Sequence, residues 1–270
     1  MISLPACGLY AITAPSQTMG LDPDTIVAKV NAAIDGGASM IQYRAKERPD
    51  DLQGSAGIQD RRLRTAGLLA SLCRGRGIPL IINDDASLAL EVEACGVHIG
   101  RDDGDLGEIR RLVGEDRIVG VSCYDRLDLA LQAAAEGASY VAFGSFFPSS
   151  IKTRAVSPPI SILARARERI DLPIVAIGGI GADRAGELIA AGASFIAAIT
   201  GVFGAGGQEN DRFEEKGILA DPHLREMERL RTIERAARAY ARLFPPPIGE
   251  SRHDLEPPRQ AISNKRESDR

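Results

Sequence analysis

The stretch that decides the fold runs from residue 174 to residue 200 and reads IVAIGGIGADRAGELIAAGASFIAAIT. An apolar, β-branched run is followed by a glycine turn, an amphipathic pattern, a glycine-alanine pair and a second apolar run. Short strands joined by a helix in this way form a parallel βαβ unit. The sequence therefore predicts strands at Ile174–Ile177 and Phe195–Ile199, with a helix at Asp183–Ala190 between them.

The same unit recurs along the chain. Eight strand-helix units predict a parallel sheet and favour a (β/α)8 TIM barrel, although the count alone does not exclude a doubly wound open sheet. Glycine-alanine pairs at Gly37, Gly137 and Gly192 mark helix ends, where glycine takes the left-handed cap conformation. Apolar runs predict the other strands at Gly8–Thr13, Met40–Tyr43, Leu80–Ile82, Val97–Ile99, Ile118–Val121 and Tyr140–Phe143. Helical periodicity predicts helices at Thr25–Asp35, Arg61–Arg74, Asp125–Glu136, Ile160–Arg169 and Leu224–Leu243.

Three polar segments interrupt this pattern. The segment Asp50–Asp60 is expected to lengthen the loop after the second strand. A glycine-rich, charged insert near 204–222 precedes the last helix, so residues 1–244 are expected to form one barrel domain. Residues 245–270 are proline-rich and have few large apolar side chains, which predicts a disordered tail.

The composition narrows the class of protein. The chain is 44% hydrophobic and 26% charged, which is ordinary for a globular protein. A net charge of −4 gives no reason to expect nucleic-acid binding, so an acidic ligand needs local cations. No signal peptide or long apolar run is present, and the four cysteines form no C-x-x-C pair. We expect a cytoplasmic protein with reduced thiols that does not bind membranes.

Polar side chains follow several predicted strands, at the end of a barrel where chemistry takes place. Gln42, Arg44 and Lys46 alternate after the second strand, so they point to one side and suit an acidic ligand. Asp84 follows the third strand and Asp103 the fourth. Carboxylates on adjacent strands can share one Mg2+ ion. Taken alone, the polar residues after the second strand could simply be a solvated strand end. The acidic residues after the third strand could simply cap the next helix.

The later loops carry a phosphate pattern. Ser149 and Lys152 follow the sixth strand, where hydroxyls beside a lysine can hold a phosphate. Gly179 belongs to a glycine run after the seventh strand, and backbone N–H groups there can approach a phosphate. His98, within the fourth strand, could act as a general base, but a hydrogen-bonded structural role is the simpler interpretation.

The motifs QYRAK, LIINDD, GVHIGRDD, GVSCY, FGSFFPSSIK and AIGGI occur in that order, each after a predicted strand. The set resembles the thiamine-phosphate synthase family from Leu9 to Thr200. This resemblance implies a transferase that displaces diphosphate from 4-amino-2-methyl-5-(diphosphooxymethyl)pyrimidine. The incoming nitrogen belongs to 4-methyl-5-(2-phosphoethyl)thiazole or its carboxylate, and a pyrimidine methylene cation precedes thiamine phosphate. Both substrates are small phosphorylated molecules, and family members are often homo-oligomers.

The resemblance also implies roles for individual residues. It assigns Mg2+ to Asp84 and Asp103, and a catalytic contribution to Arg44, Lys46, Ser122 and Lys152. The pyrimidine substrate and its diphosphate would contact Gln42, Arg44, Lys46, Asn83, Ser122 and Lys152, and the thiazole phosphate would contact Ser149, Gly179, Ala197, Ala198 and Ile199.

Several positions depart from the family pattern. Ile151 replaces a threonine, although Thr153 lies two residues on, and Arg101 replaces a glutamine. Tyr124 replaces a frequent histidine, and Ala197 falls where many members carry serine. These departures leave two alternatives open: a thiazole tautomerase-like paralogue, and a non-catalytic protein that binds thiazole or thiamine phosphate. A generic phosphate-binding barrel would explain the glycine loops but not the acids facing two cations.

Overall fold

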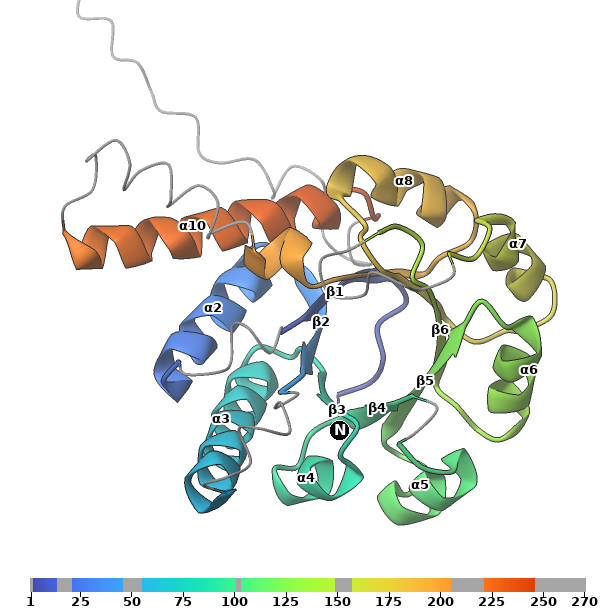
Figure 1. Ribbon diagram of the computed structural model, residues 1–270, viewed down its shortest axis with the longest axis horizontal. Helices are drawn as coiled ribbons and strands as arrows, with labels where there is room; N and C mark the ends of the chain where they lie inside the picture. The colour runs from blue at the N-terminus through green and yellow to red at the C-terminus, as the bar shows by residue number, and fades with distance from the viewer. Residues whose placement is uncertain are drawn as a thin grey trace, which may run out of the picture.

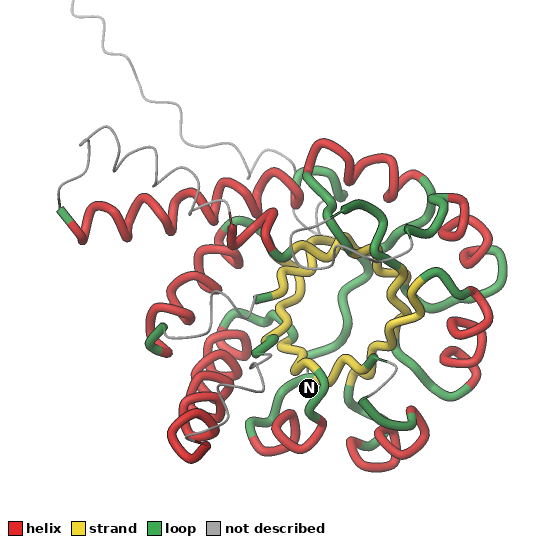
Figure 2. The backbone as a smooth tube through the Cα atoms, viewed as in Figure 1, coloured by secondary structure: helices red, strands yellow, loops and turns green. Residues whose placement is uncertain are grey.

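The computed structural model describes residues 2–13, 21–45, 55–100, 103–148, 157–204 and 221–245. Eight parallel strands pair in chain order, and β8 pairs with β1, so the sheet closes (Figures 1 and 2). Closure confirms the (β/α)8 prediction and excludes the open sheet. Among the described residues, no helix is both long and apolar enough to cross a bilayer.

The eight strands lie close to their predicted positions. The largest difference is at β5, which extends to Tyr124, because a shift in pairing register lengthens it. The strands are β1 (Gly8–Ile12), β2 (Ala38–Tyr43), β3 (Leu80–Asn83), β4 (Gly96–Ile99), β5 (Ile118–Tyr124), β6 (Tyr140–Phe143), β7 (Ile174–Ile177) and β8 (Phe195–Ala198).

Helices surround the barrel. Those found by periodicity are α2 (Pro23–Asp35), α3 (Ser55–Gly75), α6 (Leu127–Ala135), α7 (Ser161–Arg167), α8 (Ala182–Ala190) and α10 (Pro222–Ala241). Two more helices, α4 (Ala86–Glu91) and α5 (Leu106–Val113), were not predicted; α4 is too short to show a 3.6-residue period, whereas α5 is amphipathic over its eight residues. The Asp85 side chain caps α4 by accepting from the Leu88 N–H at 2.8 Å, as its position predicted. Gly37, Gly137 and Gly192 have positive φ at their helix ends, as predicted.

Two predicted segment boundaries are wrong. Residues 55–60 form the first turns of α3 and not a loop, because polar residues such as Gln59 also suit the exposed face of a helix. The last helix begins at Pro222, where Asp221 caps it by accepting from the His223 N–H at 2.8 Å. Residues 205–220 of the predicted insert and residues 246–270 of the predicted tail lie outside the described residues.

The core has two layers because successive strand residues face opposite sides. On β1, Tyr10 and Ile12 point into the barrel, while Leu9 and Ala11 pack against the helices. The interior layer is Tyr10, Ile12, Met40, Ile81, Cys95, Ile118, Tyr140, Ala142, Val175, Phe195 and Ala197. Ile2 and Leu4 pack against this layer from the N-terminal segment, which crosses the barrel end in Figure 2.

Candidate active site

Two carboxylates lie at the carboxyl ends of the adjacent strands β3 and β4. Asp84 directly follows β3, and its backbone N–H donates to the carbonyl oxygen of His98 at 2.8 Å. Asp103 follows β4, and its Oδ2 atom accepts from the backbone N–H of Gly100 at 2.8 Å. The Asp103 charge also acts on His98, where it partly opposes the lowering of the pKa by burial. Asp84 is therefore tied to His98 through its backbone, and the Asp103 carboxylate acts on the same residue through its charge.

Arg44 lies near Asp84, at the end of β2. Its backbone N–H donates to Oγ1 of Thr13 at 2.9 Å, which fixes the start of the chain beyond the strand. Burial lowers the pKa of the guanidinium, and the Asp84 carboxylate partly opposes that shift. The Nη1 atom is buried and has no hydrogen-bond partner among the residues described. Because a buried donor without an acceptor is unfavourable, Arg44 is suited to bind an anionic ligand.

A chain of hydrogen bonds crosses the barrel interior from β2 to β5. The Nε2 atom of Gln42 donates to Oη of Tyr10 at 2.7 Å, and the phenol oxygens of Tyr10 and Tyr140 are 2.9 Å apart. The Tyr140 oxygen lies 2.9 Å from Nδ1 of His98, whose Nε2 lies 2.9 Å from Oγ of Ser122. His98 also stacks on Tyr140, with ring centroids 5.6 Å apart. The chain thus joins two predicted site residues, Gln42 and Ser122.

The donors in this chain run in one direction. Because Gln42 donates to Tyr10, each phenol hydrogen finds an acceptor if Tyr10 donates to Tyr140 and Tyr140 donates to Nδ1 of His98. The proton of His98 then sits on Nε2 and is donated to Ser122. Burial lowers the pKa of His98 to about 4 and raises the pKa values of both tyrosines. The side chains of this hydrogen-bond chain are therefore uncharged at neutral pH. His98 acts as a hydrogen-bonding residue and is a poor base.

A bulge in β5 sets the direction of Ser122. The pairing with β6 shifts between Ser122 and Tyr124, and Tyr124 takes a positive φ of 56°. Such a shift re-aims the neighbouring side chains. The Tyr124 phenol lies near Gly100, where an added Cβ would be 3.5 Å from its oxygen and 2.9 Å from Oδ2 of Asp103. The tyrosine that replaces a common histidine of the family therefore borders the turn that holds Asp103.

The loops after β6 and β7 pack tightly against each other. The Phe147 N–H donates to the Gly178 carbonyl oxygen at 3.0 Å. Gly179 has a φ of +60°, and a Cβ on it would lie 2.5 Å from the carbonyl oxygen of Pro148. Only glycine fits this position, because an added side chain would meet backbone and adopt a strained conformation.

Residues 178–181, which we call the β7 loop, present backbone donors. Within the described ranges, the N–H groups of Gly179, Ile180 and Gly181 have no hydrogen-bond acceptor. Gly181 is the N-cap of α8, so these donors stand at the positive end of the helix dipole. Consecutive free N–H groups at a helix N-terminus suit a phosphate.

Residues 199–204, which we call the β8 turn, follow the last strand. Ala197 points into the barrel and Ala198 towards the helices, so both lie within the strand, as the prediction of a strand at Phe195–Ile199 requires. Ile199 opens the turn, and its carbonyl oxygen accepts from the Phe203 N–H at 2.9 Å. A single π-helical turn, η2 (Thr200–Gly204), follows. Within this turn the side chains of Val202 and Phe203 are buried.

Some predicted site residues are not placed. Lys46, Ser149 and Lys152 lie outside the described residues, as do Arg101, Ile151 and Thr153. Gln42, Arg44, Asn83, Asp84, Asp103 and Ser122 lie at or just beyond the carboxyl ends of β2 to β5. Among the residues that it describes, the structure therefore brings together those predicted to bind the pyrimidine substrate and the metal. Gly179 and Ile199, predicted to bind the thiazole phosphate, follow β7 and β8 on the other side of the barrel.

The two carboxylates fit Mg2+ only with help from a ligand. In the part of the chain that is described, no group of three or more histidine, cysteine, aspartate or glutamate side chains could hold a metal ion. Mg2+ commonly takes one or two protein carboxylates and completes its shell with water and substrate phosphate. Asp84 and Asp103 match that donor set, because they lie on adjacent strands near a buried cation.

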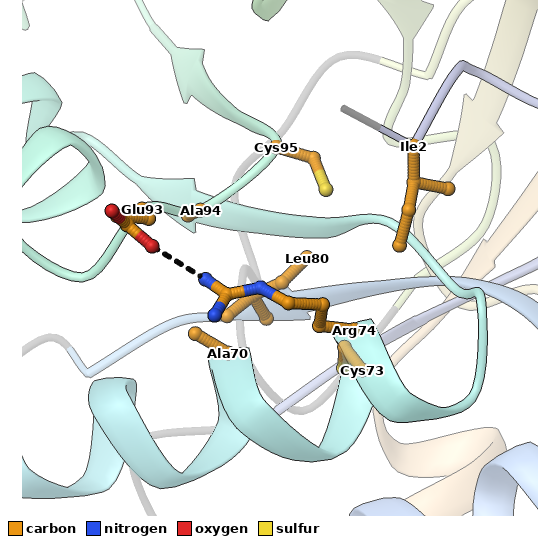
Figure 3. Close-up of a pocket in the computed structure, with 8 residues that line it drawn as sticks. All are labelled: Ile2, Ala70, Cys73, Arg74, Leu80, Glu93, Ala94 and Cys95. Carbon is orange, nitrogen blue, oxygen red and sulfur yellow. Dashed lines mark hydrogen bonds and ion pairs between the residues drawn. The ribbon is translucent and has the colours of Figure 1, made fainter.

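A cavity of about 350 Å³ lies at the opposite end of the barrel, where β3 and β4 begin. An ion pair of 2.9 Å joins Arg74 and Glu93 at this cavity (Figure 3), and both side chains are more than half exposed. The lining is Ile2, Ala70, Cys73, Arg74, Leu80, Glu93, Ala94 and Cys95. The cavity is mostly apolar and contains none of the predicted site residues, so it is separate from the candidate site.

Sequence reasoning missed the middle of the hydrogen-bond chain. Tyr10 and Tyr140 are aromatic residues in apolar strands, a pattern that predicts core packing. Strand alternation could have shown that these tyrosines point into the barrel, because Tyr10 and Ile12 are two residues apart and lie on the same face of β1. An inward tyrosine needs a hydrogen-bond partner when it is buried.

The family model for thiamine monophosphate synthase matches residues 9–202. The chain belongs to the thiamine monophosphate synthase family. A thiamine-phosphate synthase of Methylococcus capsulatus is 46% identical over 204 residues, which cover 76% of this chain and 85% of that protein. A thiamine-phosphate synthase of Methylobacillus flagellatus is 49% identical over 195 residues, or 72% and 87% of the two chains.

Solved structures agree with this family assignment. A thiamine phosphate pyrophosphorylase from Pyrococcus furiosus aligns with a TM-score of 0.64 and 26% identity, covering 88% of this chain and 95% of that one. The YdjI aldolase from Escherichia coli aligns with a TM-score of 0.60 at 14% identity, which shows a shared barrel fold alone.

Proposed function

We propose that the protein is a thiamine-phosphate synthase, which joins 4-amino-2-methyl-5-(diphosphooxymethyl)pyrimidine to 4-methyl-5-(2-phosphoethyl)thiazole, or its carboxylate, and releases diphosphate. The observation that carries this proposal is the half-buried guanidinium of Arg44, with its buried Nη1 atom, near Asp84, and Asp103 after the next strand. A protein that only isomerises or binds a thiazole phosphate has no need for a cation and two carboxylates at a second anion site. The family membership and the 46% identity to named synthases support the same conclusion.

The reaction needs the negative charge of the leaving group to be stabilised. The bond between the pyrimidine methylene carbon and the diphosphate oxygen breaks, and its electron pair leaves with the oxygen. The Nη1 donor of Arg44 is the described group best suited to bind that oxygen cluster, with Lys46 and Lys152 as further cations. Asp84 and Asp103 would hold Mg2+, which neutralises diphosphate charge when it is bound.

The pyrimidine site must tolerate a developing positive charge. The hydrogen-bond chain from Gln42 to Ser122 lines the barrel interior, and burial keeps it neutral at neutral pH. A protonated His98 at this place would oppose a cation on the pyrimidine methylene carbon. We assign Gln42, Asn83 and Ser122 to binding the pyrimidine and its diphosphate. The thiazole nitrogen then supplies the electron pair for the new carbon–nitrogen bond, so no protein nucleophile is required.

The thiazole phosphate is assigned to the opposite side of the barrel mouth. The free N–H groups of Gly179, Ile180 and Gly181 provide donors at the N-terminus of α8. We also place the backbone of the β8 turn, starting at Ile199, and the side chain of Ser149 at this phosphate. The two substrates then enter from opposite sides, which brings the thiazole nitrogen towards the pyrimidine methylene carbon.

The test is formation of thiamine phosphate from the two substrates, followed by chromatography. We expect product with wild-type protein and at least a tenfold lower rate for Arg44→Gln, which keeps a long polar side chain but removes the charge. Glu93→Gln, which alters a charge at the distant cavity, is the matched control and should keep the wild-type rate. Isomerisation of the thiazole without coupling would replace the proposal with the tautomerase alternative, and binding without turnover would replace it with the binding-protein alternative.

A further inference from the structure

The last helix reaches the phosphate side of the barrel mouth through one side chain. Tyr240 lies near the C-terminus of α10 and is 2% exposed. Its hydroxyl donates to the carbonyl oxygen of Ile180 at 2.8 Å, a contact between residues that are 60 positions apart. Ile180 lies between Gly179 and Gly181, so the bond holds the middle of the β7 loop.

The same hydroxyl touches the β8 turn. A Cβ atom added to Gly201 would lie 2.1 Å from Oη of Tyr240 and 3.4 Å from the carbonyl oxygen of Ile180. The phenol oxygen therefore sits between the β7 loop and the β8 turn, in contact with both. Burial raises the pKa of Tyr240 to about 12, with a smaller contribution from the charge of Asp183. The hydroxyl is therefore uncharged and can donate at neutral pH.

The helix that carries Tyr240 has its own support. Gly36, at the end of α2, lies so close to α10 that an added Cβ would be 2.4 Å from the Glu234 carbonyl oxygen and 2.6 Å from Cβ of Ala237. The Arg238 guanidinium donates to the Asp35 carbonyl oxygen at 3.4 Å. Figure 1 shows α10 lying along α2, with its C-terminal half beside the η2 turn and α8. The packing of α10 against α2 therefore fixes the position of Tyr240 relative to the barrel.

The geometry points to Tyr240 as a positioning residue that sets the spacing between the β7 loop and the β8 turn, and hence the affinity for the thiazole phosphate. This inference rests on the proposed placement of that phosphate between the two segments. Donors from two loops bind one phosphate well only when both loops are held in register. Tyr240 lies beyond residue 202, where the match to the family model ends. The last helix of this chain therefore contributes to substrate binding without contacting the substrate.

The test is the variant Tyr240→Phe, which removes the hydroxyl and keeps the ring. We expect the KM for the thiazole phosphate to rise about three- to tenfold, the effect of one lost net hydrogen bond. The kcat at saturating thiazole phosphate and the KM for the pyrimidine diphosphate should stay at wild-type values. Calorimetry with thiazole phosphate alone should show the same loss of affinity, and this measurement needs no turnover.

The matched control is Ile233→Val on the same helix. Ile233 is 1% exposed and apolar, so the substitution loosens the packing of α10 without touching either loop. It should lower the melting temperature and leave both KM values unchanged. If Tyr240→Phe does not fold, Gly201→Ala approaches the same contact from the β8 turn and should also weaken thiazole phosphate binding.

The outcomes separate this inference from the proposed function. Wild-type turnover with an unchanged KM and an unchanged affinity in Tyr240→Phe overturns the inference and leaves the synthase proposal intact. Equal losses in Tyr240→Phe and Ile233→Val also overturn it, because helix packing alone would then explain the effect. A wild-type protein that binds thiazole phosphate without turnover, with weaker binding in Tyr240→Phe, supports the inference and refutes the synthase proposal. No binding of thiazole phosphate by the wild type would refute both.

Discussion

Replacing His98 with glutamine should remove a defined pH dependence from the stability of the fold. Burial lowers the pKa of His98 from 6.5 to about 4, although the nearby Asp103 carboxylate opposes the shift. Above about pH 6.5 the residue is neutral in both the folded and unfolded chain, and its stabilising contribution is fully present. As the pH falls from about 6.5 to about 4, the unfolded chain binds a proton that the folded protein does not. The loss amounts to about 3 kcal/mol.

The assay is urea denaturation of wild-type and His98→Gln protein without Mg2+, over a series of pH values. The variant loses hydrogen bonds to Tyr140 and Ser122, so it should be less stable at about pH 7. The gap between the two proteins should narrow by about 3 kcal/mol as the pH falls to about 4. His223→Gln, on an exposed position of the first turn of α10, is the control and should follow the wild type. A gap that stays constant with pH would refute the assignment of His98 as a buried neutral residue.

Three further predictions concern the site and the chain end. Asp84→Asn should lower activity at least about tenfold at limiting Mg2+, as expected for a metal ligand, and retain the melting temperature; near-normal turnover would contradict the metal role. Asparagine is a better probe than alanine because Asp84 has a φ of +65°, which asparagine tolerates. Gly120→Ala should disrupt the hydrogen-bond chain, since its Cβ would lie 1.9 Å from Cζ of Tyr140; a melting temperature and pyrimidine KM equal to wild type would show that the ring is free to move. Truncation after residue 245 should change neither the melting temperature nor the turnover, because the removed sequence has few apolar residues to bury; a large loss of either would show that the tail contributes to the fold.

The sequence predicted the parts of the site that depend on local pattern. Asp84 directly follows β3 and Asp103 lies in the loop after β4, so the pairing of these strands in the predicted barrel is enough to bring them to the same end. The same reasoning placed Gln42 at the mouth of the barrel, and the family resemblance added Ser122. It could not connect them, because the contact between Tyr10 and Tyr140 joins residues 130 positions apart, and no local pattern reports such a pair.

Tertiary packing also explains the errors in the fold. The segment before Arg61 was predicted as a loop because it is polar, but α3 starts at Ser55 with an exposed face. The helices α4 and α5 have only six and eight residues, and helices this short are stabilised by packing in the folded protein more than by their own sequence. The sequence predicted the helix that carries Tyr240, but the bond of Tyr240 to Ile180 depends on how α10 packs against α2.

The measurement that tests the central claim most directly is the release of diphosphate by the purified protein. The protein would receive the pyrimidine diphosphate and the thiazole phosphate, together and separately, with and without Mg2+. The account predicts release that requires both substrates and Mg2+, with one thiamine phosphate formed for each diphosphate. Binding of thiazole phosphate with no release under any of these conditions would contradict it, because the barrel would then hold one substrate without catalysing the coupling.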